Sequence, residues 1–440
     1  MSKRDLRRRE FLRTSTLGLA GAAGVAVGGK GLEAQQTAPA SAPEPPKVKG
    51  FRTLGRTGFS VSDIGSGSIY EPGVFKAMLD AGVNYIDTAE SYPGHHRIVG
   101  DAIKGRDRKS LFISSKMLMD EGDITRAGLL QRARKCLEEL GTEYVDCMMM
   151  HMPEKVELLK LESFHQAMQE LKTEGRVRFL GVSHHGSFWF RDPETSMDRV
   201  LLAAAEDGRY DVFLLAYNFL QMDSGQRVFD ACREKKIGTA VMKSKPIVTF
   251  DRIKTRIEGL EKEGKEVDPL FREGLARYQK LADQMDAFVK KYRLENQDEI
   301  REASVRFVLD NPGVSTICCS ARTFDEATRY VSLSGMRFTD WDRARLAAYS
   351  EGCGRFYCRH ACGVCEPSCP RGVPVNTIMR YSHYFEAQGR EKEAMSLYAG
   401  IPGARADVCS SCAGHCERAC AHGVPIQGML LVAHRTLSLA

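Results

Sequence analysis

Cysteines with regular spacing near the C-terminus are the residues most able to do chemistry in this 440-residue chain. Nine of its fourteen cysteines fall in the last 88 residues, and eight of these form two ordered runs. Thiolates in such dense runs hold iron–sulfur clusters. The sequence therefore predicts a C-terminal cofactor domain with two [4Fe–4S] clusters. The predicted ligands are Cys358, Cys362, Cys365 and Cys369 in the first run and Cys409, Cys412, Cys416 and Cys420 in the second.

Two other uses of these cysteines stay open from the sequence. Zinc sites also take four cysteines, but usually as two separated pairs. Disulfides are an alternative if the protein is exported, although neighbouring cysteines in a short helical turn rarely reach bridging geometry. The runs resemble those of bacterial two-cluster ferredoxins, with one residue added in each run and Ala421 in place of the proline after the last cysteine. Cys353 is interpreted as a bystander, with replacement of Cys358 as a ligand left open.

The 39 residues between the two runs indicate what kind of cofactor domain this is. They include a helical-looking stretch, 376–398, with several charges and no internal proline. A mostly helical ferredoxin-like domain over residues 346–440, with its clusters between helices, is therefore expected.

A second set of reactive residue types lies earlier in the chain. Asp87, Tyr92, Lys116 and His151 are types suited to one proton-transfer site. Singly, each has a plain structural interpretation, since Asp87 could cap a helix and His151 could be a buried core histidine. Taken together, they predict a shared site, provided that the fold brings four separated positions to one place.

The middle of the chain supplies such a fold, because short apolar runs alternate with amphipathic stretches from Phe51 onward. Eight strand candidates separated by helices predict a parallel sheet with right-handed crossovers. Eight units over roughly 250–300 residues favour a (β/α)8 TIM barrel, whose active site lies at the C-terminal ends of the strands. A doubly wound open sheet is the alternative, but Gly65-Ser66-Gly67 is only a fragment of its glycine-rich loop. The expected strands are 63–68, 84–87, 111–116, 145–151, 178–183, 212–217, 239–243 and 314–319, and expected helices include 127–140, 162–174 and 223–235.

At the ends of these strands the chain resembles the aldo-keto reductases. Residues 85–92, Tyr-Ile-Asp-Thr-Ala-Glu-Ser-Tyr, are similar to that family's Asp…Tyr motif. Ser114-Ser115-Lys116 is similar to its lysine strand end, and His151-Met152-Pro153 is similar to its histidine motif. The resemblance covers about residues 50–345 and includes Leu54-Gly55-Arg56-Thr57-Gly58 and Gly181-Val182-Ser183.

The resemblance implies an oxidoreductase that interconverts a small-molecule carbonyl and an alcohol, with NAD(P) carrying the hydride. Tyr92 would donate the proton, and His151 would orient the carbonyl oxygen. A free tyrosine has a pKa near 10, too high for efficient acid catalysis at neutral pH. Lys116 would lower that pKa, and Asp87 would pair with Lys116 and hold it.

The resemblance also implies a cofactor site, with departures from the family's pattern. His184 stands where the family usually has asparagine, Leu214 where it has glutamine, and Cys319-Ser320 where it has a proline–glycine pair. These departures predict a modified pose or a reduced affinity for NAD(P). The implied contacts are Tyr217 stacking on the nicotinamide, Ser183 and its neighbour His184 at the carboxamide, Lys243, Ser244 and Lys245 at the pyrophosphate, and Arg322 and Thr323 at an adenosine phosphate.

The first 34 residues are interpreted as an export signal. Arg8-Arg9-x-Phe11-Leu12-Arg13 matches the twin-arginine order, and the apolar run that follows is too short to span a membrane. The twin-arginine route carries folded proteins, and iron–sulfur ligands fold around clusters built in the cytoplasm. The sequence therefore predicts a periplasmic or other extracytoplasmic protein. Its expected parts are the signal, 1–34, a linker, 35–49, the barrel, 50–345, and the cluster domain, 346–440.

Without residues 1–34 the chain is nearly neutral. That segment carries a net charge of +4 and the whole chain +6, which leaves about +2. A near-neutral domain argues against nucleic acid as a partner, and no basic amphipathic helix indicates stable insertion into a membrane. A charged insertion, 250–299, is expected to be either a solvated helical pair or a lid over the barrel mouth.

Three functions stay open from the sequence. The leading one is an exported oxidoreductase with Tyr92 as its general acid and base. The second is an iron–sulfur electron-transfer protein whose barrel binds a ligand or a redox partner protein. The third is a binding protein on a barrel that no longer catalyses. The clusters either accept electrons, although hydride carries two electrons and each cluster takes one, or serve as structural links of the C-terminal segment with no redox role.

Overall fold

The computed structural model describes residues 44–119, 122–185, 196–246, 297–360 and 362–438, with isolated positions between 261 and 290. The expected signal, most of the linker and most of the charged insertion lie outside the described residues. From Pro45 onward the chain forms one compact unit. Among the residues that are described, no helix has the length and apolar character needed to cross a membrane.

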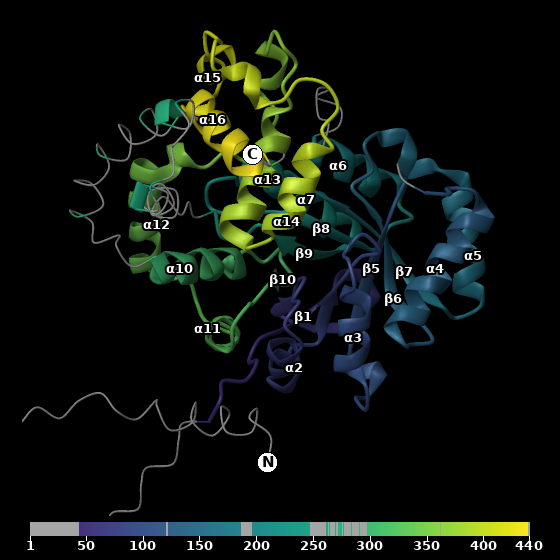
Figure 1. The fold of residues 1–440 in the computed structure, drawn as a ribbon. Coiled ribbons are helices and arrows are strands. Elements are labelled where there is room, and N and C mark those ends of the chain that lie inside the picture. Colours follow the sequence, from purple (N-terminus) through teal and green to yellow (C-terminus); the bar gives the residue numbers. More distant parts are fainter. Residues whose placement is uncertain are drawn as a thin grey trace, which may run out of the picture. The chain divides into compact units, whose positions relative to one another are not determined.

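Eight parallel strands close into a barrel in the order β10-β3-β4-β5-β6-β7-β8-β9 (Figure 1). Every strand expected from the sequence is present, with ends that differ by at most two residues. The predicted (β/α)8 barrel is therefore confirmed, and the doubly wound open sheet is wrong. The strands are β3 (Ile64–Ser66), β4 (Tyr85–Asp87), β5 (Phe112–Leu118), β6 (Val145–His151), β7 (Val177–His184), β8 (Val212–Ala216), β9 (Gly238–Met242) and β10 (Thr316–Cys319).

The barrel strands are runs of apolar residues because a parallel barrel buries both faces of each strand. All seven residues of β5 and of β6 are buried. Successive side chains alternate between the barrel interior and the surrounding helices. The interior holds Tyr85, Phe112, Cys147, Met149 and Leu214 together with Leu54 and Val61, from the region of the antiparallel hairpin β1 (Phe51–Thr53) and β2 (Ser60–Ser62).

Helices cover the outside of the barrel and bury the outward-facing residues of its strands. The three helices expected at 127–140, 162–174 and 223–235 are present as α4, α5 and α7. The covering helices are α2 (Pro72–Asp80), α3 (His95–Ile103), α4 (Arg126–Leu140), α5 (Glu162–Thr173), α6 (Met197–Asp207), α7 (Asp223–Lys235), α10 (Gln297–Asp310) and α11 (Phe324–Ser332), with short 3₁₀ turns η1 (Gly55–Thr57), η2 (Arg108–Ser110) and η3 (Val156–Lys160).

The C-terminal lobe is helical and has a hydrophobic core of its own, which includes Ile378, Tyr398 and Leu430. The helix expected over 376–398 is in fact two helices, because Gly389 ends the first in the left-handed conformation, with φ of 65°. The elements are α12 (Asp340–Cys353), α13 (Val375–Gln388), α14 (Glu391–Ala399), α15 (His415–Arg418) and α16 (Ile426–Leu437), with the 3₁₀ turns η5 (Gly354–Phe356), η6 (Glu366–Ser368) and η7 (Ala406–Cys409).

The lobe contains an internal repeat that the sequence analysis missed. The pattern Cys-Glu-x-x-Cys-x-x-Gly-Val-Pro occupies residues 365–374 and recurs at 416–425, immediately before α13 and α16. Glu366 accepts the backbone N–H of Asn376 at 2.7 Å, and Glu417 accepts that of Gln427 at 3.0 Å. Each cysteine run therefore leads into a helix, and the glutamate inside the run caps the first turn of that helix.

The loop after β8 attaches the first cysteine run to the barrel. The Asn218 amide donates to the Tyr357 hydroxyl at 3.4 Å, and the Arg359 guanidinium donates to the carbonyl of Leu220 at 3.3 Å. The Gln221 amide donates to the carbonyl of His360. The ring centroid of Tyr384 on α13 lies 4.5 Å from the ammonium of Lys243, which follows β9, so the lobe reaches the end of the barrel where the polar strand ends lie; Figure 1 labels both elements.

Candidate active site

Asp87, Tyr92, Lys116 and His151 come together at the C-terminal ends of β4, β5 and β6. The ammonium of Lys116 lies 2.8 Å from Asp87 Oδ2 and 3.4 Å from the Tyr92 hydroxyl. It also donates to the carbonyl of Thr88 at 2.7 Å. The Tyr92 ring meets the His151 ring edge-on, with centroids 5.9 Å apart. The barrel thus joins all four residues into one constellation.

The pKa of Tyr92 differs from the expectation that Lys116 would lower it. Burial raises the pKa of Tyr92, and Lys116 opposes that shift in the direction expected from the sequence. Burial is the larger effect, so the pKa stays above its ordinary value. For Lys116, burial favours the neutral form, but Asp87 and Tyr92 outweigh it and raise the pKa. Lys116 is therefore a fixed positive charge beside a protonated phenol.

His151 is a neutral histidine in this site. Burial and the nearby charge of Lys116 lower the pKa of His151 well below its ordinary value. Its Nδ1 lies 3.3 Å from the Ser91 hydroxyl. A neutral imidazole can orient an oxygen by a hydrogen bond but carries no charge to release. His151 is suited to positioning, and Tyr92 to proton donation.

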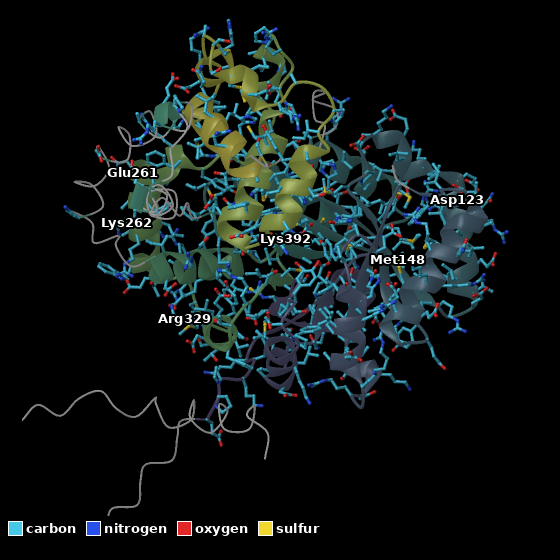
Figure 2. All side chains as sticks on the ribbon, viewed as in Figure 1. Asp123, Met148, Glu261, Lys262, Arg329 and Lys392 are labelled. Atoms are coloured by element: carbon cyan, nitrogen blue, oxygen red, sulfur yellow. The ribbon has the colours of Figure 1, made fainter. Side chains whose placement is uncertain are left out.

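A cavity of about 1090 Å³ opens above the constellation, and both the barrel and the lobe line it. From the barrel come Asp87, Tyr92 and His151, and from the lobe come Tyr384 and Arg390 among others. The labelled side chains of Arg329 on α11 and Lys392 on α14 help to find the elements around it (Figure 2). The expected lid, 250–299, lies almost wholly outside the described residues; the roof that the structure describes is the α13–α14 hairpin.

The expected phosphate contacts lie in this cavity. Lys243, Ser244, Lys245, Arg322 and Thr323 all line it. Thr323 caps α11, since its hydroxyl accepts the backbone N–H of Glu326 at 3.1 Å. The start of a helix presents backbone N–H groups and a partial positive charge, which suits an anion. This end of the cavity has the donors that a dinucleotide phosphate needs.

The expected nicotinamide contacts are placed differently. Ser183 and His184 are fully buried at the end of β7 and are not among the described residues that line the cavity. Tyr217 packs its ring on Phe307, with centroids 5.7 Å apart, and accepts a hydrogen bond from Asn311 at 3.1 Å. It faces the helices because Val212 and Leu214 take the inward positions of β8.

The site includes residues of the lobe that were not predicted from the sequence. His383, Tyr384 and Arg390 lie around the break between α13 and α14 and line the cavity. The guanidinium of Arg390 donates to Glu393 at 2.7 Å and lies 4.7 Å from the centroid of the Tyr384 ring. Gly389, the helix-ending residue of the stretch expected to be one helix, was the signal that could have revealed a turn there.

The electrostatic neighbours of the run cysteines fall into two sets, each of which draws on both runs. Burial raises the pKa of the Cys358 thiol well above its ordinary value, and Cys365, Cys362 and Cys420 add to that shift. Burial raises the pKa of Cys409 to about 12, with Cys416, Cys369 and Cys412 adding to it. The cysteines that influence Cys358 and those that influence Cys409 thus come from both runs. The sets are Cys358, Cys362, Cys365 and Cys420, and Cys369, Cys409, Cys412 and Cys416, and they adjoin at Cys365 and Cys416.

Other features of the cysteines bear on the alternatives. All fourteen thiols are free of disulfides. The backbone N–H of Val373 donates to Cys369 Sγ at 3.3 Å, and the Asn376 amide donates to Cys358 Sγ at 3.8 Å. Within the described ranges, no group of three or more His, Cys, Asp or Glu side chains could hold a metal ion. Burial alone raises the pKa of Cys353 to about 11, in keeping with a bystander.

Comparisons with known proteins place the barrel in a family. The sequence model of the aldo/keto reductase family matches residues 73–351. The methylglyoxal reductase DkgB of Salmonella typhi is 32% identical over 111 residues, which are 25% of this chain and 40% of that protein. The aldo-keto reductase YhdN of Bacillus subtilis is 23% identical over 282 residues, 61% of this chain and 80% of that protein.

The chain spans about 40% of the length of the first curated relatives that it matches. A solved aldo-keto reductase from Klebsiella pneumoniae in complex with NADPH has a TM-score of 0.47 at 20% identity, and the match covers 68% of this chain and 94% of that one. The family match ends at residue 351, before both cysteine runs.

Proposed function

The chain belongs to the aldo/keto reductase family, and on that premise we propose that it interconverts a small-molecule carbonyl and an alcohol with a nicotinamide cofactor. The observation that carries this proposal is the position of Lys116. Its ammonium bridges Asp87 and the Tyr92 hydroxyl beneath a cavity that Tyr92 and His151 line. A buried cation held next to a phenol is what proton transfer to a substrate oxygen requires.

The side chains divide the work of proton transfer in the direction of reduction. The nicotinamide supplies hydride to the carbonyl carbon when it is bound, and the carbonyl oxygen then needs one proton. Tyr92 donates that proton and becomes a phenolate. The phenolate is stabilised by the ammonium of Lys116, which Asp87 and the carbonyl of Thr88 hold in place. Neutral His151 orients the oxygen, and water returns the proton to Tyr92.

The residues present fit a nicotinamide cofactor in part. Lys245, Arg322 and Thr323 would hold its phosphates at the α11 end of the cavity. The Ser183 hydroxyl is buried with no hydrogen-bond partner in the described part of the chain, which suits a carboxamide contact. Tyr217 faces the outer helices, so we leave the stacking role unassigned.

We further propose that the two cysteine sets hold two [4Fe–4S] clusters. Two features support this: eight buried or half-buried thiols whose electrostatic neighbours fall into two sets of four, and the N–H donors directed at Cys369 and Cys358. Exchange of the last cysteine between runs is a feature of two-cluster ferredoxins. The clusters would supply one-electron chemistry or a fixed core for the lobe.

Export by the twin-arginine route is also proposed, with an extracytoplasmic location as its consequence. The support is the order Arg8-Arg9-x-Phe11-Leu12-Arg13 and the need of cluster proteins to fold before export. Replacing Arg8 and Arg9 with lysine tests this by fractionation, since a protein that is still exported would contradict it.

A second candidate function is electron transfer between the cluster site and a molecule in the cavity. One helix carries the observation that favours it: on α13, Asn376 donates to Cys358 Sγ, and His383 lines the cavity. Seven residues of helix separate them by roughly 10 Å at 1.5 Å per residue. Partners of that function would be a redox protein or a bound small molecule.

The proposed reaction is tested by Tyr92→Phe in the full chain, purified without oxygen. Loss of the proton donor should lower kcat by roughly 10²–10⁴-fold, while circular dichroism and Tm stay unchanged because the ring remains. Tyr144→Phe is the control, since Tyr144 stacks under Arg108 outside the cavity lining. Full activity in Tyr92→Phe would refute the assignment.

A further inference from the structure

Lys243 is a lysine of the cavity wall that makes no ion pair with an acid within the described residues. It follows β9 with a left-handed backbone, φ 58°, which is strained for a residue with a side chain. Its ammonium lies 4.5 Å above the Tyr384 ring. Burial lowers the pKa of Lys243 well below its ordinary value, and the positive charges of Arg380 and Arg390 add to that shift, so an anion beside the amine would restore its charged form. A charge out of bulk water without an opposite charge is costly, so this arrangement favours an anionic ligand.

Three histidines stand around this lysine. His185 and His360 are only 5% and 3% exposed, and His185 Nδ1 and His360 Nε2 have no hydrogen-bond partner in the part of the chain that is described. The ring of His383 lies 5.0 Å from that of His360. His185 and His383 line the cavity together with Lys243. Unsatisfied buried ring nitrogens are rare without a purpose, and neutral imidazoles can donate to an anion.

Lys243 was itself an expected phosphate contact, but its position differs from that of Lys245, Arg322 and Thr323. Lys245, two residues on, lies 4.0 Å above the ring of Tyr330 on α11, at the end of the cavity with Arg322 and Thr323. Lys243 instead meets Tyr384 on α13 of the lobe. The two side chains therefore point to different elements, Lys245 to α11 and Lys243 to α13.

The neighbouring cation Arg390 does not take the same role. Its guanidinium is paired with Glu393, at 2.7 Å for one of its two hydrogen bonds. It nevertheless influences the electrostatics of both Tyr92 and Lys243. The proton donor Tyr92 and Lys243 both line the same cavity.

We propose that Lys243, His185 and His383 form an anion subsite that binds the carboxylate of the substrate. The carboxylate supplies the negative charge that pairs with the ammonium of Lys243, and it accepts hydrogen bonds from the histidines. The subsite selects carbonyl compounds or alcohols that carry an acid group. The inference rests on the proposed function only in calling the bound molecule a substrate. Binding of an anion at this subsite does not require that the protein turns it over.

The test is an NMR titration of the full chain with acetate, and with acetamide as its uncharged match, in the presence of saturating NADP+. Acetate should bind and acetamide should not. Lys243→Gln should raise the Kd of acetate by at least roughly 10-fold, the loss expected for a hydrogen bond to a charged group. Lys392→Gln, at an exposed lysine of α14 outside the cavity lining, should change nothing.

Three results would overturn the subsite: no acetate binding, an unchanged Kd in Lys243→Gln, or acetate that binds only when NADP+ is absent. The last result would show that Lys243 binds the cofactor rather than the substrate. Should Lys243→Gln fail to fold, His383→Gln serves, with a smaller rise in Kd. A protein that binds acetate in this way but reduces no carbonyl would keep the subsite and lose the proposed reaction, so the two failures are distinguishable.

Discussion

At the scale of single residues, burial sets the protonation states of the site. The pKa of Tyr92 is raised by burial despite Lys116, and that of His151 is lowered by burial and Lys116 together. Each group is thereby held in its neutral form at pH 7. A neutral phenol donates a proton and a neutral imidazole orients, so the same physical cause assigns both roles.

His95, whose ring meets that of Tyr92 edge-on with centroids 6.1 Å apart, shows the same effect and leads to a prediction on stability. Its Nε2 accepts the backbone N–H of Ile69 at 3.1 Å, so Nδ1 carries the proton and donates to Thr88 Oγ1 at 2.8 Å. Burial lowers the pKa of His95 to about 3. The unfolded chain binds this proton near pH 6.5. Stability is therefore fully present above pH 6.5 and is lost as the pH falls toward 3.

We expect His95→Gln to remove that loss. Urea unfolding at pH 7 and pH 5 should show the native protein losing up to about 1.4 kcal/mol per pH unit more than the variant. Tyr70 and Phe75 contact the same ring, so some stability is lost in the variant at both pH values. Equal acid loss in the two proteins would contradict the account of His95.

Residue types at strand ends could be predicted from the sequence, whereas side-chain direction could not. Asp87, Lys116 and His151 end or nearly end apolar runs, which is a signal that a sequence carries. Tyr217 also follows such a run. Because side chains of β8 alternate and Val212 and Leu214 point into the barrel, the ring of Tyr217 points to the covering helices. No composition or spacing reports that alternation at the end of a strand.

At the scale of elements, the α13–α14 hairpin is the part that sequence reasoning could not place. The expected helix, 376–398, has the right composition, but Gly389 divides it and lets α14 turn back over the cavity. The grouping of the cysteines across runs was likewise not predicted, because it depends on how two repeated segments pack. Both follow from tertiary arrangement rather than from local pattern.

Gly389 provides a test of the hairpin. Its φ is 65°, and an added Cβ would lie 3.1 Å from a guanidinium nitrogen of Arg322. Gly389→Ala should therefore destabilise the protein by about 1–2 kcal/mol, the cost of left-handed backbone for an L-residue. Gly400→Ala is the control, since Gly400 has φ of −77° and ordinary contacts of 3.6 Å. Similar shifts of Tm in the two variants would argue against the turn.

Pairs of cysteine variants test the exchange between runs. Cys362 and Cys420 belong to one set, whereas Cys362 and Cys369 belong to different sets. The double variant Cys362→Ala/Cys420→Ala should lose about half of the bound iron, because one cluster keeps all four ligands. Cys362→Ala/Cys369→Ala should lose nearly all of it. Iron analysis of protein purified without oxygen distinguishes them, and the reverse order would show that each run holds its own cluster.

At the scale of the whole molecule, barrel and lobe form one compact unit and share one cavity. The eight strands were predictable because each is an apolar run between helices. The shared cavity was not, because it requires residues that lie far apart in the chain, such as Lys243 and Tyr384, to meet. Chemistry carried by the barrel is therefore enclosed by the segment that carries the cysteines.

The proposed reaction requires that the barrel transfers hydride from the nicotinamide cofactor to the carbonyl carbon. The most direct measurement is the origin of the new hydrogen on carbon. A carbonyl compound that the protein turns over is reduced in ordinary water with NADPH deuterated at both C4 positions, and the alcohol is examined by NMR. We predict one deuterium on the carbinol carbon. Hydrogen from water at that carbon would contradict the claim and assign the reduction to electrons from the clusters.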